Sequence, residues 1–166
     1  MPSIDIGGAA IDRLSDKGPN WTTISKENPA NKAGELLFVE VFAANTVGGL
    51  LVGTFYGSGT TWTCRDYAVI GAAPPGWSRH EVSILVGVGD LIGFYCSAGS
   101  LDSYNEGGPG WLSKSGNHFV IGTPYTYSNP CTACGLSLYG ERPLVIGSGA
   151  SFSGRRQFLM SCGGRG

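Results

Sequence analysis

The chain has 166 residues, a charged content of 14% and a formal net charge of -1 at pH 7. This length suits one domain that buries a core without needing a disulfide or a metal ion. The nearly balanced charge provides no long-range field for phosphate backbones or anionic lipids, and the most apolar run, Leu50 to Tyr56, is far shorter than the ~20 residues that cross a bilayer. We therefore expect no nucleic-acid partner, no membrane partner and no secretory leader.

The first strand predictions rest on β-forming residue types and on alternation. Trp21 to Ile24 is a short β-forming run, and Leu50 to Tyr56 is a longer one between glycine-rich turns. Thr61 to Arg65 alternates with a period of two, which places Trp62 and Cys64 on one face. Each run is typical of a strand with one buried face.

Residues 31–44 fit either a helix or a strand. In a helix, Asn31 would cap the first turn, but Gly34 would lie inside that turn and Glu40 would fall on the apolar stripe. A strand over Leu36 to Ala43 instead forms one uniformly apolar face, which carries Leu37, Val39, Val41 and Ala43. We predict the strand.

The opposite face of that strand is also largely apolar, because it carries Leu36, Phe38, Glu40 and Phe42. A free monomer usually keeps such a face polar to stay soluble. We predict that Leu36, Phe38 and Phe42 belong to an interface between copies of the chain. The alternative is that the opposing sheet or a loop of the same chain covers them.

The stretch Gly87 to Cys96, GVGDLIGFYC, shares only its glycines with a nucleotide-binding loop. A dinucleotide fingerprint has the spacing G-x-G-x-x-G and leads into a helix. Here the spacing is G-x-G-x-x-x-G, and the strand-like run Leu91 to Cys96 follows. The preceding residues, Glu81 to Val86, alternate apolar and polar. We therefore predict that Gly87 to Asp90 is a hairpin turn between two strands.

Beyond Cys96 the strand pattern weakens. Residues 97–117 are predicted to form one long loop, and the remaining short strand candidates are Phe119 to Ile121, Leu136 to Tyr139, Leu144 to Ile146 and Gln157 to Met160. Turn signals recur about every ten residues, which is typical of sandwiches and barrels. The predicted fold is all-β: a single antiparallel β-sandwich over residues 1–166, similar to a jelly roll.

Residues with catalytic or metal-binding chemistry form no recognised constellation. The lone C-x-x-C at 131–134 lacks a second ligand pair, so we expect a turn with buried or disulfide-linked sulfurs rather than zinc. No G-x-S-x-G elbow occurs, and neither His80 nor His118 has flanking residues that identify a catalytic base. Asp102 and Glu106 have a spacing that is common by chance. We predict no enzyme activity, no cofactor and no metal.

The long loop contains the candidate ligand-binding residues, because long loops in compact domains are often functional. Tyr104 and Trp111 would offer flat faces to sugar rings. Asp102, Asn105 and Glu106 would accept hydrogen bonds from hydroxyl groups or supply oxygens to a calcium ion. The alternative is a solvated loop with Trp111 folded back onto the core.

Four segments, in their order along the chain, resemble a group of β-sandwich proteins encoded in bacteriophage and environmental viral genomes. They are Lys26 to Asn31 (KENPAN), Glu35 to Ala44 (ELLFVEVFAA), Thr63 to Asp66 (TCRD) and Val88 to Tyr95 (VGDLIGFY). The resemblance covers roughly residues 21–101, with a weaker echo at 136–140, and extends to modules of virion surface and tail-fibre proteins. It carries over no catalytic or ligand residue.

Two functions follow as expectations. The resemblance implies a structural virion protein, a capsid decoration or fibre-associated module that is assembled in the host cytoplasm and joins other virion proteins as a homo-oligomer. The alternative is a carbohydrate-binding or adhesion module that contacts a cell-surface glycan through the aromatic loop around Trp111.

Overall fold

The structure is a computed structural model that describes residues 2–144. The predicted strand Gln157 to Met160, residues 145 and 146 of the predicted strand Leu144 to Ile146, and Cys162 lie outside the described residues. Residues 2–144 contain no helix that is long and apolar enough to cross a membrane.

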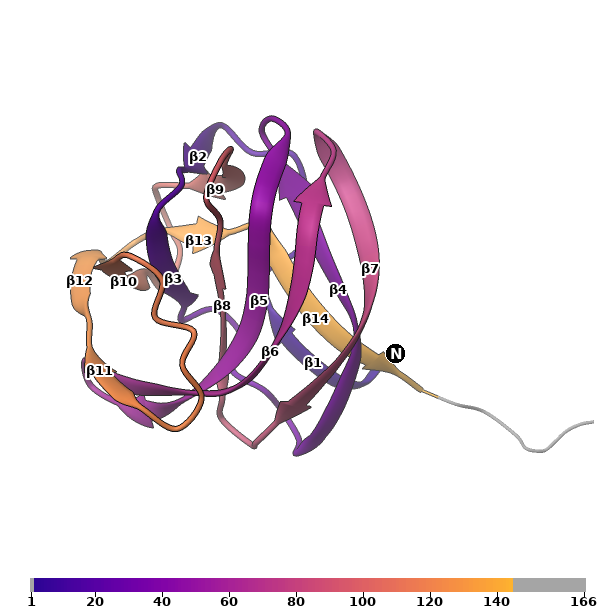
Figure 1. Ribbon diagram of the computed structural model, residues 1–166, viewed down its shortest axis with the longest axis vertical. Coiled ribbons are helices and arrows are strands. Elements are labelled where there is room, and N and C mark those ends of the chain that lie inside the picture. The colour runs from indigo at the N-terminus through magenta and orange to yellow at the C-terminus, as the bar shows by residue number, and fades with distance from the viewer. Residues whose placement is uncertain (1, 145–166) are drawn as a thin grey trace, which may run out of the picture.

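Two antiparallel sheets pack face to face, so the predicted all-β sandwich is confirmed (Figure 1). Sheet A contains β7 (Gly76–Val86), β4 (Gly34–Ala43), β14 (Leu138–Pro143) and β1 (Pro2–Gly7), with the short strands β9 (Leu101–Tyr104), β13 (Gly135–Leu136) and β2 (Ser15–Lys17) at one end. Sheet B has the order β11 (Pro124–Thr126), β6 (Thr61–Ala73), β5 (Val47–Ser58), β8 (Leu91–Tyr95), β3 (Trp21–Ser25), β10 (Trp111–Ser115) and β12 (Ser128–Cys131).

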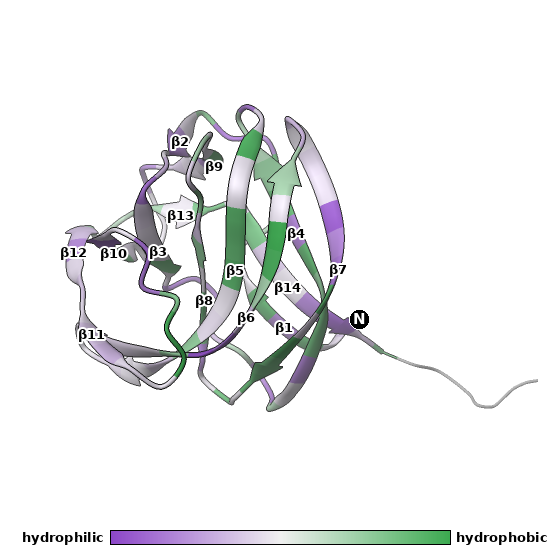
Figure 2. Ribbon diagram, viewed as in Figure 1, coloured by the Kyte–Doolittle hydropathy of each residue, from purple (hydrophilic) through white to green (hydrophobic). Residues whose placement is uncertain are grey.

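The main core lies between the two sheets and is built from the inward side chains of both. Its fully buried members include Ile6, Leu36, Val39, Leu50 and Phe94. Figure 2 shows the long hydrophobic stretches of β5 and β6 that contribute to it. Of these two strands, β5 is the one whose β-forming residue types are the more obvious in the sequence.

A second, smaller core lies on the outer side of sheet B, under the segment of residues 116–127. Phe119 of that segment packs edge-on against Phe55 of β5, with 5.2 Å between ring centroids, and against Tyr67 of β6 at 5.5 Å. The predicted strand Phe119 to Ile121 is wrong, because only Ile121 forms an isolated bridge, to Cys64. The apolar residues there cover a sheet face instead of joining it.

The strand prediction for residues 36–43 is confirmed by β4, but the expected side-chain directions of Leu36 and Leu37 are wrong. Val39, Val41 and Ala43 face the core as predicted. A β-bulge between Leu36 and Phe38 shifts the register against β7, so Leu36 is fully buried and Leu37 is not. A strict period of two cannot anticipate this shift.

The turn at Gly87 to Asp90 is confirmed, but it is not a hairpin. β7 belongs to sheet A and β8 to sheet B, so the turn carries the chain from one sheet to the other. Asp90 is buried in this turn, where its carboxylate accepts the Gly87 N–H at 2.8 Å and pairs with Arg65 of β6. An ion pair between the turn and β6 takes the place of the expected hairpin ladder.

The predicted loop at 97–117 is also wrong in extent, since β9 and β10 both lie within it. The part without a strand between them is residues 105–110. The predicted strand Leu136 to Tyr139 is present but divides at Ser137 into β13 and β14. β6 extends well beyond the predicted Thr61 to Arg65, because its later residues alternate less clearly.

Candidate functional site

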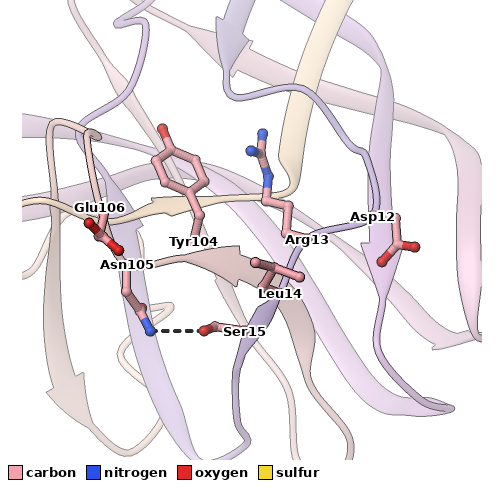
Figure 3. Close-up of a pocket in the computed structure, with 7 residues that line it drawn as sticks. All are labelled: Asp12, Arg13, Leu14, Ser15, Tyr104, Asn105 and Glu106. Atoms are coloured by element: carbon pink, nitrogen blue, oxygen red, sulfur yellow. Dashed lines mark hydrogen bonds between the residues drawn. The ribbon is translucent and has the colours of Figure 1, made fainter.

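The residues predicted to bind a ligand meet a segment from the start of the chain. β2 pairs antiparallel with β9, with Asp16 opposite Asp102, and this pairing brings residues 12–15 beside residues 104–106. Between them lies a pocket of about 380 Å³ (Figure 3). This volume is near the lower end of the roughly 300–1,000 Å³ of small-molecule sites.

Arg13 and Tyr104 form the centre of the pocket. The Arg13 guanidinium lies 4.4 Å from the centroid of the Tyr104 ring, and Figure 3 shows the two side chains next to each other. Arg13 is held by hydrogen bonds from Nε to Ser137 Oγ at 2.8 Å and from Nη2 to the Ala9 carbonyl at 3.0 Å. The Tyr104 ring also packs on Gly135, where a Cβ atom would overlap it.

These contacts leave Tyr104 as a poor stacking platform. The guanidinium lies over its ring, and backbone atoms of a neighbouring strand lie against it. Burial, and then the nearby negative charge of Glu27, raise the pKa of Tyr104, while Arg13 opposes them. The phenol therefore keeps its proton and can act as a hydrogen-bond donor.

Asp102 lies beneath the pocket and does not line it. Its Oδ2 accepts the backbone N–H of Arg13 at 2.8 Å, which fixes the segment that carries the guanidinium. Burial raises the pKa of Asp102, the Arg13 N–H lowers it, and Asp12 and Asp16 raise it further. Asp102 is thus a positioning residue for Arg13.

Asn105 and Glu106 are exposed and line the pocket. Asn105 Nδ2 donates to Ser15 Oγ at 2.8 Å, whereas Glu106 and Asp12 hold their carboxylates at opposite ends of the pocket (Figure 3). The pocket therefore offers acceptors at both ends and a cation between them.

A disulfide between Cys131 and Cys134 supports the loop that carries these residues. It closes the connection from β12 in sheet B to β13 in sheet A, with a Cα–Cα distance of 5.8 Å. Two carbonyls of the same connection accept backbone N–H groups of the loop, from Gly108 to Ala133 at 3.1 Å and from Gly110 to Cys134 at 2.7 Å. The loop at 105–110 is thereby fixed to both sheets.

Trp111 is absent from the pocket. Its side chain is only 7% exposed and belongs to the core between the sheets, with the Lys17 ammonium 5.7 Å from its ring centroid. The structure therefore matches the alternative in which Trp111 folds back onto the core. Three of the five predicted ligand residues line the pocket, namely Tyr104, Asn105 and Glu106.

The same pocket is lined by four residues that the sequence did not predict as site residues: Asp12, Arg13, Leu14 and Ser15. The segment has no periodicity and no motif, and only the pairing of β2 with β9 brings it to the site. Its local composition gives no signal that would have identified it.

One hydroxyl–imidazole pair lies on β7. Ser78 Oγ lies 2.8 Å from His80 Nε2, and burial lowers the pKa of His80, so the imidazole is neutral near pH 7. Within residues 2–144, however, no carboxylate hydrogen bonds to this imidazole to orient it, as a triad would require. In that range no group of three His, Cys, Asp or Glu side chains is arranged to hold a metal ion.

No protein-family model, no curated protein and no solved structure matches this chain.

Proposed function

We propose that the chain is a structural module of a virion surface, a capsid decoration or fibre-associated β-sandwich that works as repeated copies beside other virion proteins. The support is the resemblance of residues 21–101 to such proteins, together with apolar side chains exposed to solvent. In this proposal the virion is the site of action and the host cytoplasm is the site of assembly.

The observation that carries self-assembly is a set of exposed apolar side chains on the outer side of sheet B. Val69 of β6 is 72% exposed and Ile121, which bridges to that strand, is 56% exposed, with Val120 beside it. Val69 pairs with Leu51, whose side chain packs on the outer core, so Val69 points to the same side. Contact between copies would remove these side chains from water.

The face predicted from the sequence is a weaker candidate. Leu36 is in the core, and the Arg79 guanidinium lies 4.0 Å from the ring centroid of Phe38 while it pairs with Glu40 and Glu141. Only Phe42 remains as a partly exposed apolar side chain without such a cover. Burying the charged network between copies would cost desolvation energy.

Analytical ultracentrifugation tests self-assembly and the choice of face. We expect an oligomer that the double variant Val69→Ser/Ile121→Ser dissociates to the 17.3 kDa chain, while Phe42→Ser leaves it intact. Dissociation by Phe42→Ser alone would restore the face predicted from the sequence. A wild-type protein that stays a 17.3 kDa monomer at micromolar concentration would refute self-assembly.

A second candidate function is carbohydrate binding or adhesion to a cell-surface glycan. The observation that favours it is the pocket in Figure 3, where Arg13, Asn105 and Glu106 offer donors and acceptors suited to hydroxyl groups. A glycan array with the wild type and with Asn105→Ala and Glu106→Gln tests it. Binding that both variants retain unchanged would exclude this pocket as the site.

A further inference from the structure

A second groove lies on the outer face of sheet A and adjoins the pocket in Figure 3 through residues 9–13, because Arg13 Nη2 donates to the Ala9 carbonyl at 3.0 Å. Trp77 of β7, Glu40 of β4 and Tyr139 of β14 form one side, and Ile11 with small residues of the segment 7–10 forms the other. Its volume is about 380 Å³. We refer to it as the Trp77 groove.

We propose that the Trp77 groove binds a neutral saccharide, with one sugar ring stacked on the Trp77 indole. This inference rests on the second candidate function, carbohydrate binding, and assigns the aromatic contact to a residue that the sequence did not suggest. Trp111 cannot make such a contact because it is buried in the core.

The indole is available and oriented. Trp77 is 54% exposed, so a large apolar ring faces water on a sheet surface. Its Nε1–H donates to Glu40 Oε1 at 3.4 Å, a long hydrogen bond that still gives the ring a preferred direction. Aromatic rings with a satisfied polar end and a free face suit the apolar face of a sugar.

Polar groups for sugar hydroxyls lie beside the ring. Burial raises the pKa of Tyr139 well above its ordinary value, and the nearby charges of Asp5, Glu141 and Glu40 raise it further. The phenol therefore remains protonated as a donor, while the carboxylate of Glu40 is an acceptor. A few converging polar groups next to an apolar surface are typical of a small-molecule site.

The charges favour a neutral ligand over an acidic one. Three carboxylates, those of Asp5, Glu40 and Glu141, surround Tyr139 closely enough to affect its pKa. The cations nearby are already engaged. Arg79 pairs with Glu40 at 2.5 Å and with Glu141 at 2.7 Å, and the Arg13 guanidinium, which donates to the Ala9 carbonyl of the groove wall, is stacked on Tyr104. A carboxylate, sulfate or phosphate on the ligand would be repelled.

A glycan array with neutral, amino and acidic glycans, followed by calorimetric titration of the strongest binder, tests the proposal on the full chain. We expect neutral glycans to bind, with affinity reduced about tenfold or more by Trp77→Ala and partly kept by Trp77→Phe. Tyr139→Phe should weaken binding severalfold. Trp21→Ala is the matched control, because Trp21 is 40% exposed on β3 of the other sheet and should have no effect.

Four other results of these experiments would contradict the proposal. Binding that survives Trp77→Ala but is lost in Asn105→Ala would overturn the Trp77 groove and leave carbohydrate binding in the first pocket. A wild type that binds no glycan would overturn the carbohydrate function itself. Selective binding of acidic glycans, or an oligomer that Trp77→Ala dissociates in the ultracentrifuge, would also overturn the assignment of this groove.

Discussion

The ion pair between Arg65 and Asp90 leads to the sharpest prediction about stability. Asp90 is fully buried in the turn between the sheets, and its carboxylate accepts hydrogen bonds from Arg65 Nε at 2.6 Å, Arg65 Nη2 at 3.1 Å and Gly87 N–H at 2.8 Å. The Arg65→Ala variant keeps only the bond from Gly87. It leaves a buried carboxylate with most of its partners removed.

The expected cost follows from these contacts. A hydrogen bond to a charged group contributes roughly 1.5–3 kcal/mol, and removing one partner of a buried pair costs about 3–5 kcal/mol. The Arg65 side chain is 36% exposed, so water can enter the vacated space and reduce the loss. We expect Arg65→Ala to lower the free energy of unfolding by about 2–4 kcal/mol, which corresponds to a fall in Tm of roughly 5–15 °C.

The assay is urea unfolding of wild type, Arg65→Ala, Asp90→Ala and the double variant, monitored by circular dichroism. Since the two side chains act as one unit, the double variant should lose about 1–3 kcal/mol less than the sum of the single variants. Arg65→Lys keeps the charge without the two-pronged geometry and should lie between wild type and Arg65→Ala. A loss below about 0.5 kcal/mol for Arg65→Ala, as at an ordinary surface position, would refute the reasoning.

Three further predictions concern other parts of the fold. Reduction of the Cys131–Cys134 disulfide, or the double serine variant, should lower the free energy of unfolding by about 2 kcal/mol, a modest loss because the closed loop is short. A Tm that a reducing agent does not change would contradict this. Gly53→Ala should lower the free energy of unfolding by about 1–3 kcal/mol in denaturant unfolding, because the added Cβ would lie 2.5 Å from the Asp66 carbonyl oxygen. Gly18→Ala is the control and should be neutral, because open space surrounds Gly18. Equal effects of the two variants would show that Gly53 is not sterically required. Burial lowers the pKa of His80 below 6.5, so the unfolded chain takes up its proton first and stability should decrease as the pH falls through about 6.5. His80→Gln should reduce the difference in unfolding free energy between about pH 8 and about pH 5, and an unchanged difference would rule out this contribution.

Local patterns predicted the strands whose environment is simple. β4 and β5 have long apolar runs because both lie against the main core, and the alternation of residues 81–86 matches the burial of the last part of β7. These properties depend on one sheet face at a time, which a period of two describes. Element type was therefore predictable there from the residues alone.

Properties that depend on pairing between distant strands were not predictable in this way. Gly87 was read as part of a hairpin, but its actual neighbour is the Arg65 guanidinium, which a Cβ atom would meet at 2.6 Å. Leu36 was placed on the outer face because a bulge opposite β7 is invisible in the sequence of β4 alone. Both errors concern a partner strand, and neither concerns strand propensity.

The candidate sites likewise combine residues that local sequence indicates with residues that only the fold brings together. Tyr104, Asn105 and Glu106, which line one pocket, could be predicted as a group because they lie together in the sequence, in a glycine-rich stretch with polar and aromatic side chains. Arg13, on the opposite side of that pocket, has no local signal. The Trp77 groove is built from β4, β7, β14 and the segment after β1, so no single segment could have suggested it.

The edges of sheet A bear on how copies of this chain can join. On β1, Asn31 Oδ1 accepts the Asp5 N–H at 2.9 Å, and the Asn28 carbonyl accepts the Gly7 N–H at 3.0 Å. On β7, the N–H and carbonyl of Leu85 are both bound by side chains of sheet B.

Asn31 fits the pattern of a helix cap in the sequence, but in the structure its side-chain oxygen accepts a backbone N–H of the edge strand β1. Exposed edges with free backbone groups are the usual templates for strand addition between chains. Polar groups of the same chain occupy the backbone of Asp5 and Gly7 on β1 and of Leu85 on β7, so a strand added over these residues would have to displace them. Contacts between copies should therefore be made through side chains, which is why the exposed Val69 and Ile121 on the outer side of sheet B are the more suitable surface for assembly.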